Sequence, residues 1–369
     1  MKIAFIIGTR PELIKVAPVI LELRKRKIAY DVVNTAQHKD LLDPYWKTFG
    51  IEPTVTLDVM VAGQNLSSLT ARATAAIQSY IDTVAIKPTI VMAQGDTTTV
   101  MATSLVCFYN KINFAHLEAG LRSFDFENPF PEEMNRRIAS IGAWMHFCPT
   151  EISKSNLLNE RIAANKIHVI GNTVIDALNL LVNKSDFKES SWLNLDLNKT
   201  NSYAKKVLIT CHRRENHGGN LLNIIAAVFD LATVNQDTIY VWTLHPNPNV
   251  KSKIVESTLS DLENVILVPP LDYLDLLKML DVSFCAISDS GGIQEEAPSF
   301  KTPVLVLRQA TERPEGITEG VAFLVGSDRN KITAKYNELL LKLPKFSKNP
   351  YGEGNSSRKI MDILLHNKE

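Results

Sequence analysis

The sequence predicts an α/β protein in which parallel strands alternate with helices. Short apolar runs rich in β-branched residues are followed by turns of Gly, Thr, Asp or His and then by helical stretches, from one end of the chain to the other. The 369 residues exceed one ordinary core and fit two domains. A content of 45% hydrophobic residues indicates a folded globular protein and excludes disorder over the whole length.

Three strands are expected in the first half of the chain because each apolar run ends at a polar turn. They cover residues 3–7, 89–93 and 113–116. The turns that follow them begin at Gly8, Gly95 and Glu118. Since each turn leads into a helical stretch, these segments are predicted to form βαβ units with parallel strands.

Three further strands are expected in the second half on the same grounds. They cover residues 206–210, 239–244 and 282–287. Their turns carry His212, His245 and Asp289. At the end of the chain, residues 355–369 hold apolar side chains at helical spacing and predict a closing helix that packs back on the first domain.

Residues 183–204 are polar and lack periodicity, so they are expected to link two Rossmann-like domains, residues 1–182 and 205–354. In open parallel sheets, ligands gather at the carboxyl ends of the strands, where helix N-termini present free N–H groups. Two such domains facing each other across a cleft would suit a ligand with two chemically different ends. Closure of the domains would then exclude water from the site.

Composition excludes several classes of function. Lys and Arg number 40, as do Asp and Glu, and the basic side chains are scattered, which argues against a nucleic-acid partner. The four cysteines are isolated from one another and are expected to be reduced core thiols without a metal site. No apolar run is long enough to span a membrane and no secretory signal opens the sequence, so the expected location is the cytoplasm.

The turn at Ser290, Gly291 and Gly292 follows an apolar strand and starts a helix, which favours a phosphate cradle over a simple tight turn. Glu296 lies one turn into that helix, where it could accept hydrogen bonds from ribose hydroxyls or be a solvated carboxylate. The GxGxxG and GxxxxGK[ST] patterns are missing from the chain. Their absence argues against a dinucleotide cofactor and against a P-loop kinase.

Cationic side chains stand at other strand ends. Arg10 and Lys15 follow the first strand and could bind an anionic group or be exposed helix cations. His212 and Arg213 stand where a diphosphate could be neutralised, although a single His is more often structural than catalytic. Weaker candidates of the same kind are His245 and Arg313.

Three carboxylates of the first domain are candidates for acid/base chemistry. Asp96 is interpreted equally well as a helix cap or as a general acid or base. Glu118 follows a strand, and Glu132 starts a helix. The structural alternative there is that Glu132 and Glu133 form ion pairs with Arg136 and Arg137 at i, i+4. Together with the cationic and small-residue turns of the second domain, they indicate acid/base chemistry on a phosphate-bearing substrate.

Nine motifs occur along the chain in the order GTRPE, GDTTT, HLEAGLRS, PFPEEMNRR, GNTVIDAL, HRREN, DSGGIQEEAP, TERPEG and NPYGEG. Together they resemble the non-hydrolysing UDP-N-acetylglucosamine 2-epimerases over essentially the whole chain. That family has the two-domain glycosyltransferase-B (GT-B) fold. The resemblance implies interconversion of UDP-GlcNAc and UDP-ManNAc for surface polysaccharides, no redox cofactor, and a homodimer.

The resemblance also implies roles for individual residues. The implied catalytic residues are Asp96, Glu118, Glu132, His212 and Lys15. The implied UDP-sugar ligands are Arg10, Arg213, His245, Ser290, Gly291, Gly292, Glu296 and Arg313. A second, activating UDP-GlcNAc would contact Gln37, His38 and Arg72.

Some alternatives stay open on the sequence alone. The loop at 122–128 departs from the pattern of many UDP-GlcNAc epimerases, which leaves a modified UDP-HexNAc sugar, deoxy or diacetamido, as an alternative substrate. A UDP-sugar-dependent glycosyltransferase would use the same nucleotide motifs. The GTRPE and GDTTT forms point away from the hydrolysing relatives. The sequence does not say which carboxylate is the acid and which is the base.

Overall fold

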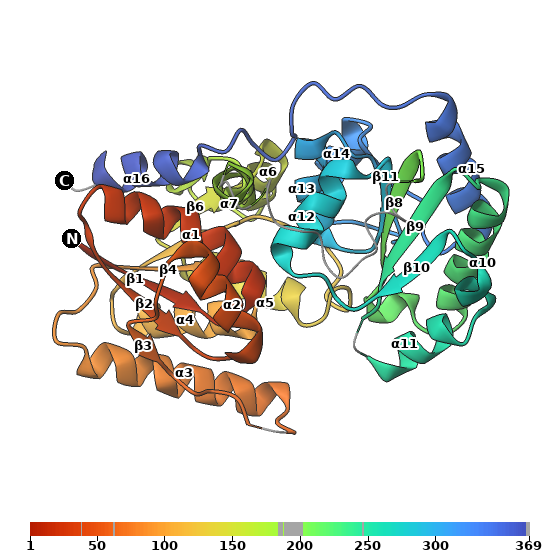
Figure 1. Ribbon diagram of the computed structural model, residues 1–369. Helices are drawn as coiled ribbons and strands as arrows, with labels where there is room; N and C mark the ends of the chain where they lie inside the picture. Colours follow the sequence, from red (N-terminus) through yellow and green to blue (C-terminus); the bar gives the residue numbers. More distant parts are fainter. Residues whose placement is uncertain (38, 62, 184–186, 188–201, 246, 367–369) are drawn as a thin grey trace. The chain divides into compact units, whose positions relative to one another are not determined.

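A seven-stranded sheet forms the first part of the protein and a six-stranded sheet forms the second (Figure 1). The computed structural model describes residues 1–37, 39–61, 63–183, 187, 202–245 and 247–366. One compact unit holds Met1–Leu180 and Tyr351–Glu369, and the other holds Leu181–Pro350. The prediction of an α/β fold with two sheets of parallel strands is confirmed. The expected linker at 183–204 lies mostly outside the described residues.

The first sheet has the strand order β3-β2-β1-β4-β5-β6-β7. Its strands are β1 (Lys2–Ile7), β2 (Ala29–Asn34), β3 (Val55–Thr56), β4 (Ile90–Gln94), β5 (Asn113–Leu117), β6 (Met145–Cys148) and β7 (Ile167–Val169). In the interior strand β1, Ile3 pairs with Tyr30 of β2 on one side and with Ile90 of β4 on the other. Residues 3–7 are all fully buried, as expected for a parallel strand covered by helices on both faces.

Helices cover both faces of the first sheet. They are α1 (Arg10–Lys25), α2 (Lys39–Phe49), α3 (Leu66–Thr83), α4 (Thr98–Tyr109), α5 (Glu132–Gly142), α6 (Glu151–Asn159), η1 (Ala164–Lys166), α7 (Thr173–Val182) and α16 (Ser356–His366). α3, α4 and α5 pack against one another on one face, and α1 lies on the opposite face (Figure 1). The core between sheet and helices includes Ile77, Val106 and Phe114.

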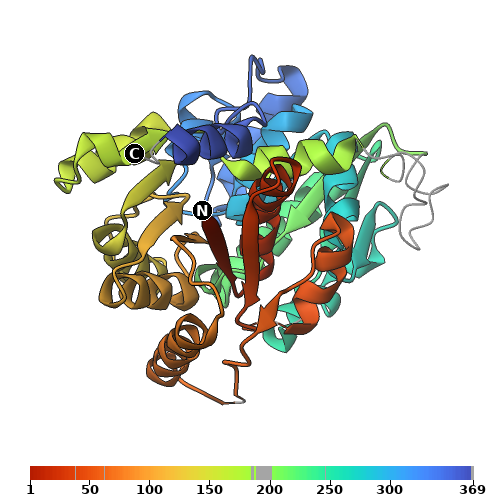
Figure 2. The ribbon, with the colours of Figure 1, turned by 90° about the vertical axis from the view of Figure 1, so that its left-hand side faces the viewer.

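The closing helix α16 packs against α1 (Figures 1 and 2). Asp176 accepts hydrogen bonds from the backbone N–H groups of Ser356 at 3.1 Å and Ser357 at 2.8 Å, which caps the first turn of α16. Further along, Arg26 and Asp362 form an ion pair at 2.7 Å. Helix α16 is therefore held in the first unit by polar contacts at its first turn and in its second half.

The second sheet has the strand order β10-β9-β8-β11-β12-β13. Its strands are β8 (Lys205–Thr210), β9 (Thr238–Thr243), β10 (Val265–Val268), β11 (Cys285–Ser288), β12 (Val304–Val306) and β13 (Ala322–Leu324). Its helices are η2 (Arg214–Asn216), α10 (Gly219–Val234), α11 (Pro248–Val255), η3 (Thr258–Asp261), α12 (Tyr273–Val282), α13 (Gly291–Glu296), η4 (Ala297–Phe300), α14 (Pro314–Thr318) and α15 (Arg329–Leu341). In this unit α10 and α15 cover one face of the sheet, and α12 and α13 cover the other (Figure 1).

The last predicted strand, 282–287, begins later than the sequence indicates. Val282 is the final residue of α12, and β11 starts only at Cys285. The apolar run continues from a buried helix into a buried strand, so hydrophobicity alone does not mark the boundary.

All four cysteines are buried free thiols. Among the described residues, no helix is long and apolar enough to cross a bilayer.

Candidate functional site

The turn between β1 and α1 is built around Gly8 and Glu12. The Glu12 carboxylate accepts hydrogen bonds from the backbone N–H groups of Gly8 at 2.6 Å and Thr9 at 3.3 Å, which closes the first turn of the helix. A Cβ atom at Gly8 would lie 2.6 Å from Oγ1 of Thr35 and 2.7 Å from Oγ1 of Thr99. The glycine therefore lets the turn approach the end of β2 and the first turn of α4.

Lys15 and Glu118 meet at the carboxyl end of the first sheet. The Lys15 ammonium forms an ion pair with Oε2 of Glu118, and both side chains are buried. Asn172 donates a hydrogen bond to the same oxygen at 3.0 Å. Glu118 has a φ of 64°, so its backbone turns sharply at the end of β5. Three segments distant in sequence thus hold one carboxylate in place.

Arg10 lies on the exposed side of the turn between β1 and α1. Its guanidinium donates a hydrogen bond to the Tyr45 hydroxyl at 3.3 Å and lies 5.6 Å from the centre of that ring. The aromatic contact leaves the guanidinium at the surface, where it can bind an anion.

Asp96 follows β4 and is paired with a cation. Its carboxylate contacts the buried Arg136 guanidinium at 2.6 Å, and its carbonyl oxygen accepts a hydrogen bond from Asn135 at 3.0 Å. Asp96 does not cap α4, because Thr97 is the N-cap and accepts a hydrogen bond from the N–H of Val100. The capping interpretation of Asp96 is therefore wrong, and its carboxylate faces α5 instead.

Glu132 is the first residue of α5, and its neighbour Glu133 contacts both the preceding loop and the next turn of the helix. Glu133 is fully buried and accepts hydrogen bonds from the N–H of Ser123 at 2.9 Å and of Phe124 at 3.3 Å. It also pairs with Arg136 at 3.3 Å and Arg137 at 3.2 Å. Glu133 thus fixes the loop before α5, while Glu132 stands one position earlier and is partly exposed.

Two buried histidines lie in the first sheet near Asp96 and Glu118, His116 in β5 and His146 in β6. His116 contacts the carbonyl oxygen of Gly95 at 2.7 Å through Nε2, which places the ring proton on that nitrogen. Burial lowers the pKa of His116 to about 4 and that of its strand neighbour His146 to about 3. Both rings are therefore neutral near pH 7 and act as core side chains.

The three residues expected at a second nucleotide site fall in different surroundings. Gln37 accepts a hydrogen bond from the Thr99 hydroxyl at 3.0 Å and lies beside the Gly8 turn. Arg72 is exposed on α3. His38 lies outside the described residues. The activating-site prediction stays a prediction.

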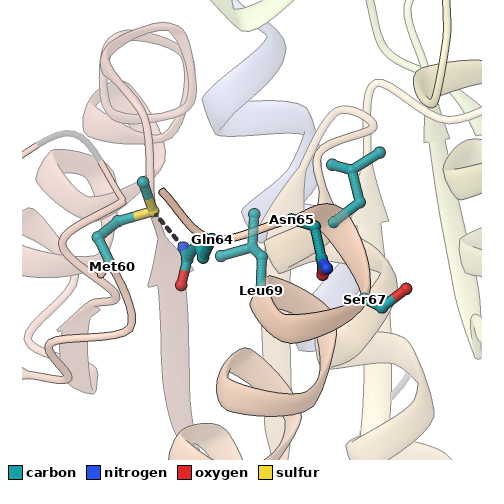
Figure 3. Close-up of a pocket in the computed structure, with 6 residues that line it drawn as sticks. Met60, Gln64, Asn65, Ser67 and Leu69 are labelled. Atoms are coloured by element: carbon teal, nitrogen blue, oxygen red, sulfur yellow. Dashed lines mark hydrogen bonds between the residues drawn. The ribbon is translucent and has the colours of Figure 1, made fainter. Parts of the chain in front are cut away.

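An open pocket of about 570 Å³ lies at the start of α3 (Figure 3). Its lining residues are Met60, Gln64, Asn65, Leu66, Ser67 and Leu69. Gln64 donates a hydrogen bond to the sulfur of Met60 at 2.8 Å across its rim. None of the residues expected to bind substrate lines this pocket.

In the second unit, several polar groups contact Asp289, which directly follows β11. The buried carboxylate accepts hydrogen bonds from the backbone N–H groups of His212 and Arg213, each at 2.9 Å, and from the Asn216 side chain at 2.9 Å. It also contacts Nδ1 of His212 at 2.8 Å. Burial alone would raise the pKa of Asp289, but the His212 ring and these donors hold it well below its usual range.

The rings of His212 and His245 stack with centroids 6.0 Å apart. The His212 side chain keeps 41% of its surface exposed, so one ring edge is open to a ligand. Burial and the nearby His212 ring lower the pKa of His245.

A network of charges supports the Ser290 turn. A Cβ at Gly291 would lie 2.6 Å from Cζ of Arg313, so the glycine makes room for that guanidinium. Arg313 is itself paired with Glu295 at 2.6 Å and with Glu312. Arg313 thus lies against the turn with two carboxylates on its guanidinium, and its predicted role as a UDP ligand stays a prediction.

Two further carboxylates near the Ser290 turn, those of Glu312 and Glu296, are buried. Burial alone would raise the pKa of Glu312, but Arg313, Arg308 and Arg213 together hold it below its usual range. The distances from Glu312 to Arg308 and Arg213 are 2.7 Å and 3.9 Å. Glu296 accepts a hydrogen bond from the Tyr273 hydroxyl at 2.8 Å.

The comparisons with known proteins agree with this arrangement of motifs. A family model described as UDP-N-acetylglucosamine 2-epimerase matches residues 21–365. The chain belongs to the UDP-N-acetylglucosamine 2-epimerase family. It is 43% identical, over 377 residues and 100% of both chains, to the UDP-N-acetylglucosamine 2-epimerase of Neisseria meningitidis serogroup A.

Two solved epimerase structures carry the same fold over their whole length. The UDP-GlcNAc 2-epimerase of N. meningitidis bound to UDP-GlcNAc matches with a TM-score of 0.91, at 43% identity and 100% coverage of both chains. The Methanocaldococcus jannaschii UDP-GlcNAc 2-epimerase in complex with UDP-GlcNAc and UDP matches with a TM-score of 0.87, at 33% identity and 100% coverage of both chains. The GT-B fold expected from the family resemblance is confirmed.

Within the epimerase fold, several polar residues were not singled out by sequence reasoning. Glu12, Asn172 and Asp289 lie inside the quoted motifs but hold side chains or turns in place through contacts that no spacing rule predicts. Helical spacing predicts Arg136 as a partner of Glu132, and the structure also pairs it with Asp96 and Glu133.

Proposed function

We propose that the protein interconverts UDP-GlcNAc and UDP-ManNAc at C2 of the sugar without hydrolysing it. The observation that carries the proposal is the end-to-end likeness to enzymes of this name. The buried Lys15 and Glu118 pair and the Asp96 carboxylate, all at the end of one parallel sheet, supply the chemistry that such a reaction requires.

The chemistry follows from the acidity of the C2 proton. Because C2 is not adjacent to a carbonyl of the ring, direct removal of the proton would leave a poorly stabilised carbanion. When a base takes the C2 proton, the C–H electron pair can instead form a C1–C2 double bond while the C1–O bond breaks and its electrons leave with UDP. Re-addition of UDP at C1 and protonation on the other face of C2 complete the epimerisation.

The first unit supplies the proton-transfer groups in this proposal. Asp96, Glu118 and Glu132 are the candidates for the acid and the base, with Arg136 paired to Asp96 and Lys15 paired to Glu118. Asn172 orients Glu118 by a hydrogen bond to the oxygen that Lys15 also contacts. Arg10, at the exposed edge of the same turn, is a candidate ligand for an anionic group of the substrate.

The second unit supplies the UDP ligands in this proposal. The backbone N–H groups of Ser290, Gly291 and Gly292 begin α13 and are the candidate phosphate donors. Glu296 is the candidate ribose ligand. His212 and Arg213 would stabilise the charge that develops on the leaving diphosphate, with His245 and Arg313 as further ligands.

The same proposal includes a homodimer in the cytoplasm that supplies surface polysaccharide synthesis. In support of the dimer, Phe108, Tyr109 and Ile141 expose 68%, 71% and 81% of their surface at adjoining ends of α4 and α5. Such large apolar side chains favour burial against a second copy. A second UDP-GlcNAc near Gln37 and Arg72 would act as an activator.

Proton NMR of the protein with UDP-GlcNAc in D2O tests the function. We expect UDP-ManNAc to appear with deuterium at C2. Variants Asp96→Asn, Glu118→Gln and Glu132→Gln should lower turnover by about 10²–10⁴-fold while retaining UDP binding. Free ManNAc would show hydrolysis, and UDP binding without any change in the sugar would overturn the proposed substrate.

A further inference from the structure

The two carboxylate oxygens of Asp289 have different surroundings. Oδ2 accepts hydrogen bonds from three donors at 2.9 Å, namely the N–H of His212, the N–H of Arg213 and the Asn216 side chain. Oδ1 faces Nδ1 of the His212 ring at 2.8 Å and the His212 N–H at the longer distance of 3.2 Å. The backbone donors therefore fix the carboxylate, and Oδ1 is left to hold the imidazole.

An ionised carboxylate can only accept hydrogen bonds. Since Asp289 is buried and held in its ionised form, the ring nitrogen that faces it must carry a proton. The neutral His212 ring then has its hydrogen on Nδ1, and Nε2 lies on the ring edge away from the carboxylate. The 41% of the side chain that stays exposed gives a ligand access to the ring.

His245 provides a contrast within the same stack. Its Nδ1 accepts a hydrogen bond from the backbone N–H of Asn247 at 3.2 Å, so its neutral ring carries the hydrogen on Nε2. The two stacked rings, with centroids 6.0 Å apart, thus hold opposite tautomers. Among the contacts of the described residues, a carboxylate faces the His212 ring and none faces the His245 ring.

We propose that Asp289 is the positioning residue of His212: it fixes the ring with Nδ1–H toward the carboxylate and presents Nε2 to the diphosphate of the substrate. This inference rests on the proposed function for the identity of the ligand. When Nε2 also carries a proton, Nε2–H donates a charge-assisted hydrogen bond to the phosphate oxygen that receives the electrons of the breaking C1–O bond.

The substitution Asp289→Asn tests the inference because the two oxygens differ. The three donors around Oδ2 require the amide oxygen there, which places the amide NH₂ opposite Nδ1 of His212. Nδ1 must then accept a hydrogen bond, and the neutral His212 ring changes to the Nε2–H tautomer. The backbone donors keep their acceptor, so the turn is expected to fold.

Nitrogen-15 NMR of the full chain labelled at histidine measures the tautomers directly. The chain has 8 histidines, and the His212 signals are assigned by their loss in His212→Gln. We expect the Nδ1–H form at neutral His212 in the unsubstituted protein and the Nε2–H form in Asp289→Asn. The matched control is Asp230→Asn, at an exposed carboxylate paired with Arg329, which should leave the His212 signals unchanged. An Nε2–H ring in the unsubstituted protein would overturn the inference without any variant.

Kinetics distinguish positioning from a general structural role. Asp289→Asn should lower kcat by about 10²-fold or more, with a smaller change in KM, because the charged donor is lost in the transition state. In a His212→Gln background the same substitution should add little, since Asp289 acts through the ring. Additive losses would contradict the inference. If the unsubstituted protein has no epimerase activity, the proposed function fails, while the tautomer measurement still decides the role of Asp289.

Discussion

Lys15 and Glu118 form a buried ion pair although they lie 103 positions apart in the sequence. One residue comes from the second turn of α1 and the other from the end of β5. Two charges taken out of water are stable only when they are paired and hydrogen-bonded, and Asn172 supplies the additional hydrogen bond. The pair therefore ties helix α1 to the end of β5 at the place where acid/base chemistry is proposed.

Replacing Lys15 by Met should destabilise the protein and abolish turnover. The substitution leaves the Glu118 carboxylate buried without this cation, and breaking a buried pair costs about 3–5 kcal/mol. Thermal unfolding and the NMR assay for UDP-ManNAc measure the two effects. The double variant Lys15→Met/Glu118→Gln should regain much of the stability but none of the activity. Equal stability of the single and double variants would show that the ion pair does not hold Glu118.

Replacing Gly291 by Ala should destabilise the second unit. The added Cβ would lie 2.6 Å from Cζ of Arg313, whose guanidinium is held by Glu295 and Glu312 and so has little freedom to move. Forcing an extra methyl group into such a contact costs about 1–3 kcal/mol. Gly292→Ala is the matched control, because its Cβ would meet only the Ser290 hydroxyl oxygen at 3.8 Å. Similar unfolding temperatures for the two variants would contradict this account.

The sequence predicts the central strands of both sheets well because they are long and apolar. The run at 3–7 coincides with β1, and the run at 206–210 with β8. The edge strands are different: β3 has two residues and β13 has three, too few to show a periodic pattern. Their positions follow from pairing with a neighbour in the sheet, which is a tertiary effect.

The candidate site was predictable to the extent that its residues follow strands. Asp96 and Glu118 stand at strand ends, and parallel topology brings those ends to one edge of the sheet. The contacts that hold them were not predictable, since the spacing in sequence says nothing of which cation meets which carboxylate. Arg313 shows the same limit, because only the structure reveals that two carboxylates surround the guanidinium.

Replacing His146 by Leu should make the protein more resistant to acid. Burial lowers the pKa of His146 to about 3, and neither of its ring nitrogens has a hydrogen-bond partner among the described residues. The unfolded chain binds this proton near pH 6.5, so the stability that the neutral ring contributes above that pH is lost as the pH falls toward 3. At pH 4.5 the free energy of unfolding has fallen by about 3 kcal/mol on this account.

The measurement for His146→Leu is the difference in unfolding temperature between variant and unsubstituted protein at pH 7 and at pH 4.5. We expect the variant to gain relative stability at the lower pH. The same substitution at His366, which is exposed at the end of α16, is the control and should show no such gain. An equal difference at both pH values would mean that His146 does not limit acid stability.

Replacing Glu12 by Gln should stabilise the protein at alkaline pH and not at acidic pH. Burial raises the pKa of Glu12 to about 7, although the N–H groups of Gly8 and Thr9 oppose this effect. The folded state therefore holds the proton more tightly than the unfolded chain, and the resulting stability is full below pH 4.5 and lost as the pH rises through 7. This rise in the pKa of Glu12 corresponds to about 3 kcal/mol in the free energy of unfolding.

The side chain introduced by Glu12→Gln would keep an amide oxygen for the N–H groups of Gly8 and Thr9. Its NH₂ would take the place of Oε1 of Glu12, a buried oxygen without a hydrogen bond in the described structure. Because the amide has no charge to bury, the stability of the variant should not fall between pH 5 and 8. Urea unfolding at these two pH values measures the difference. Glu22→Gln on the same helix is the control, since Glu22 is paired with Arg26 near the surface. The free energy of unfolding of Glu12→Gln is compared with that of the unsubstituted protein at each pH. If the difference between the two proteins is the same at both pH values, the Glu12 carboxyl group does not take up its proton on folding.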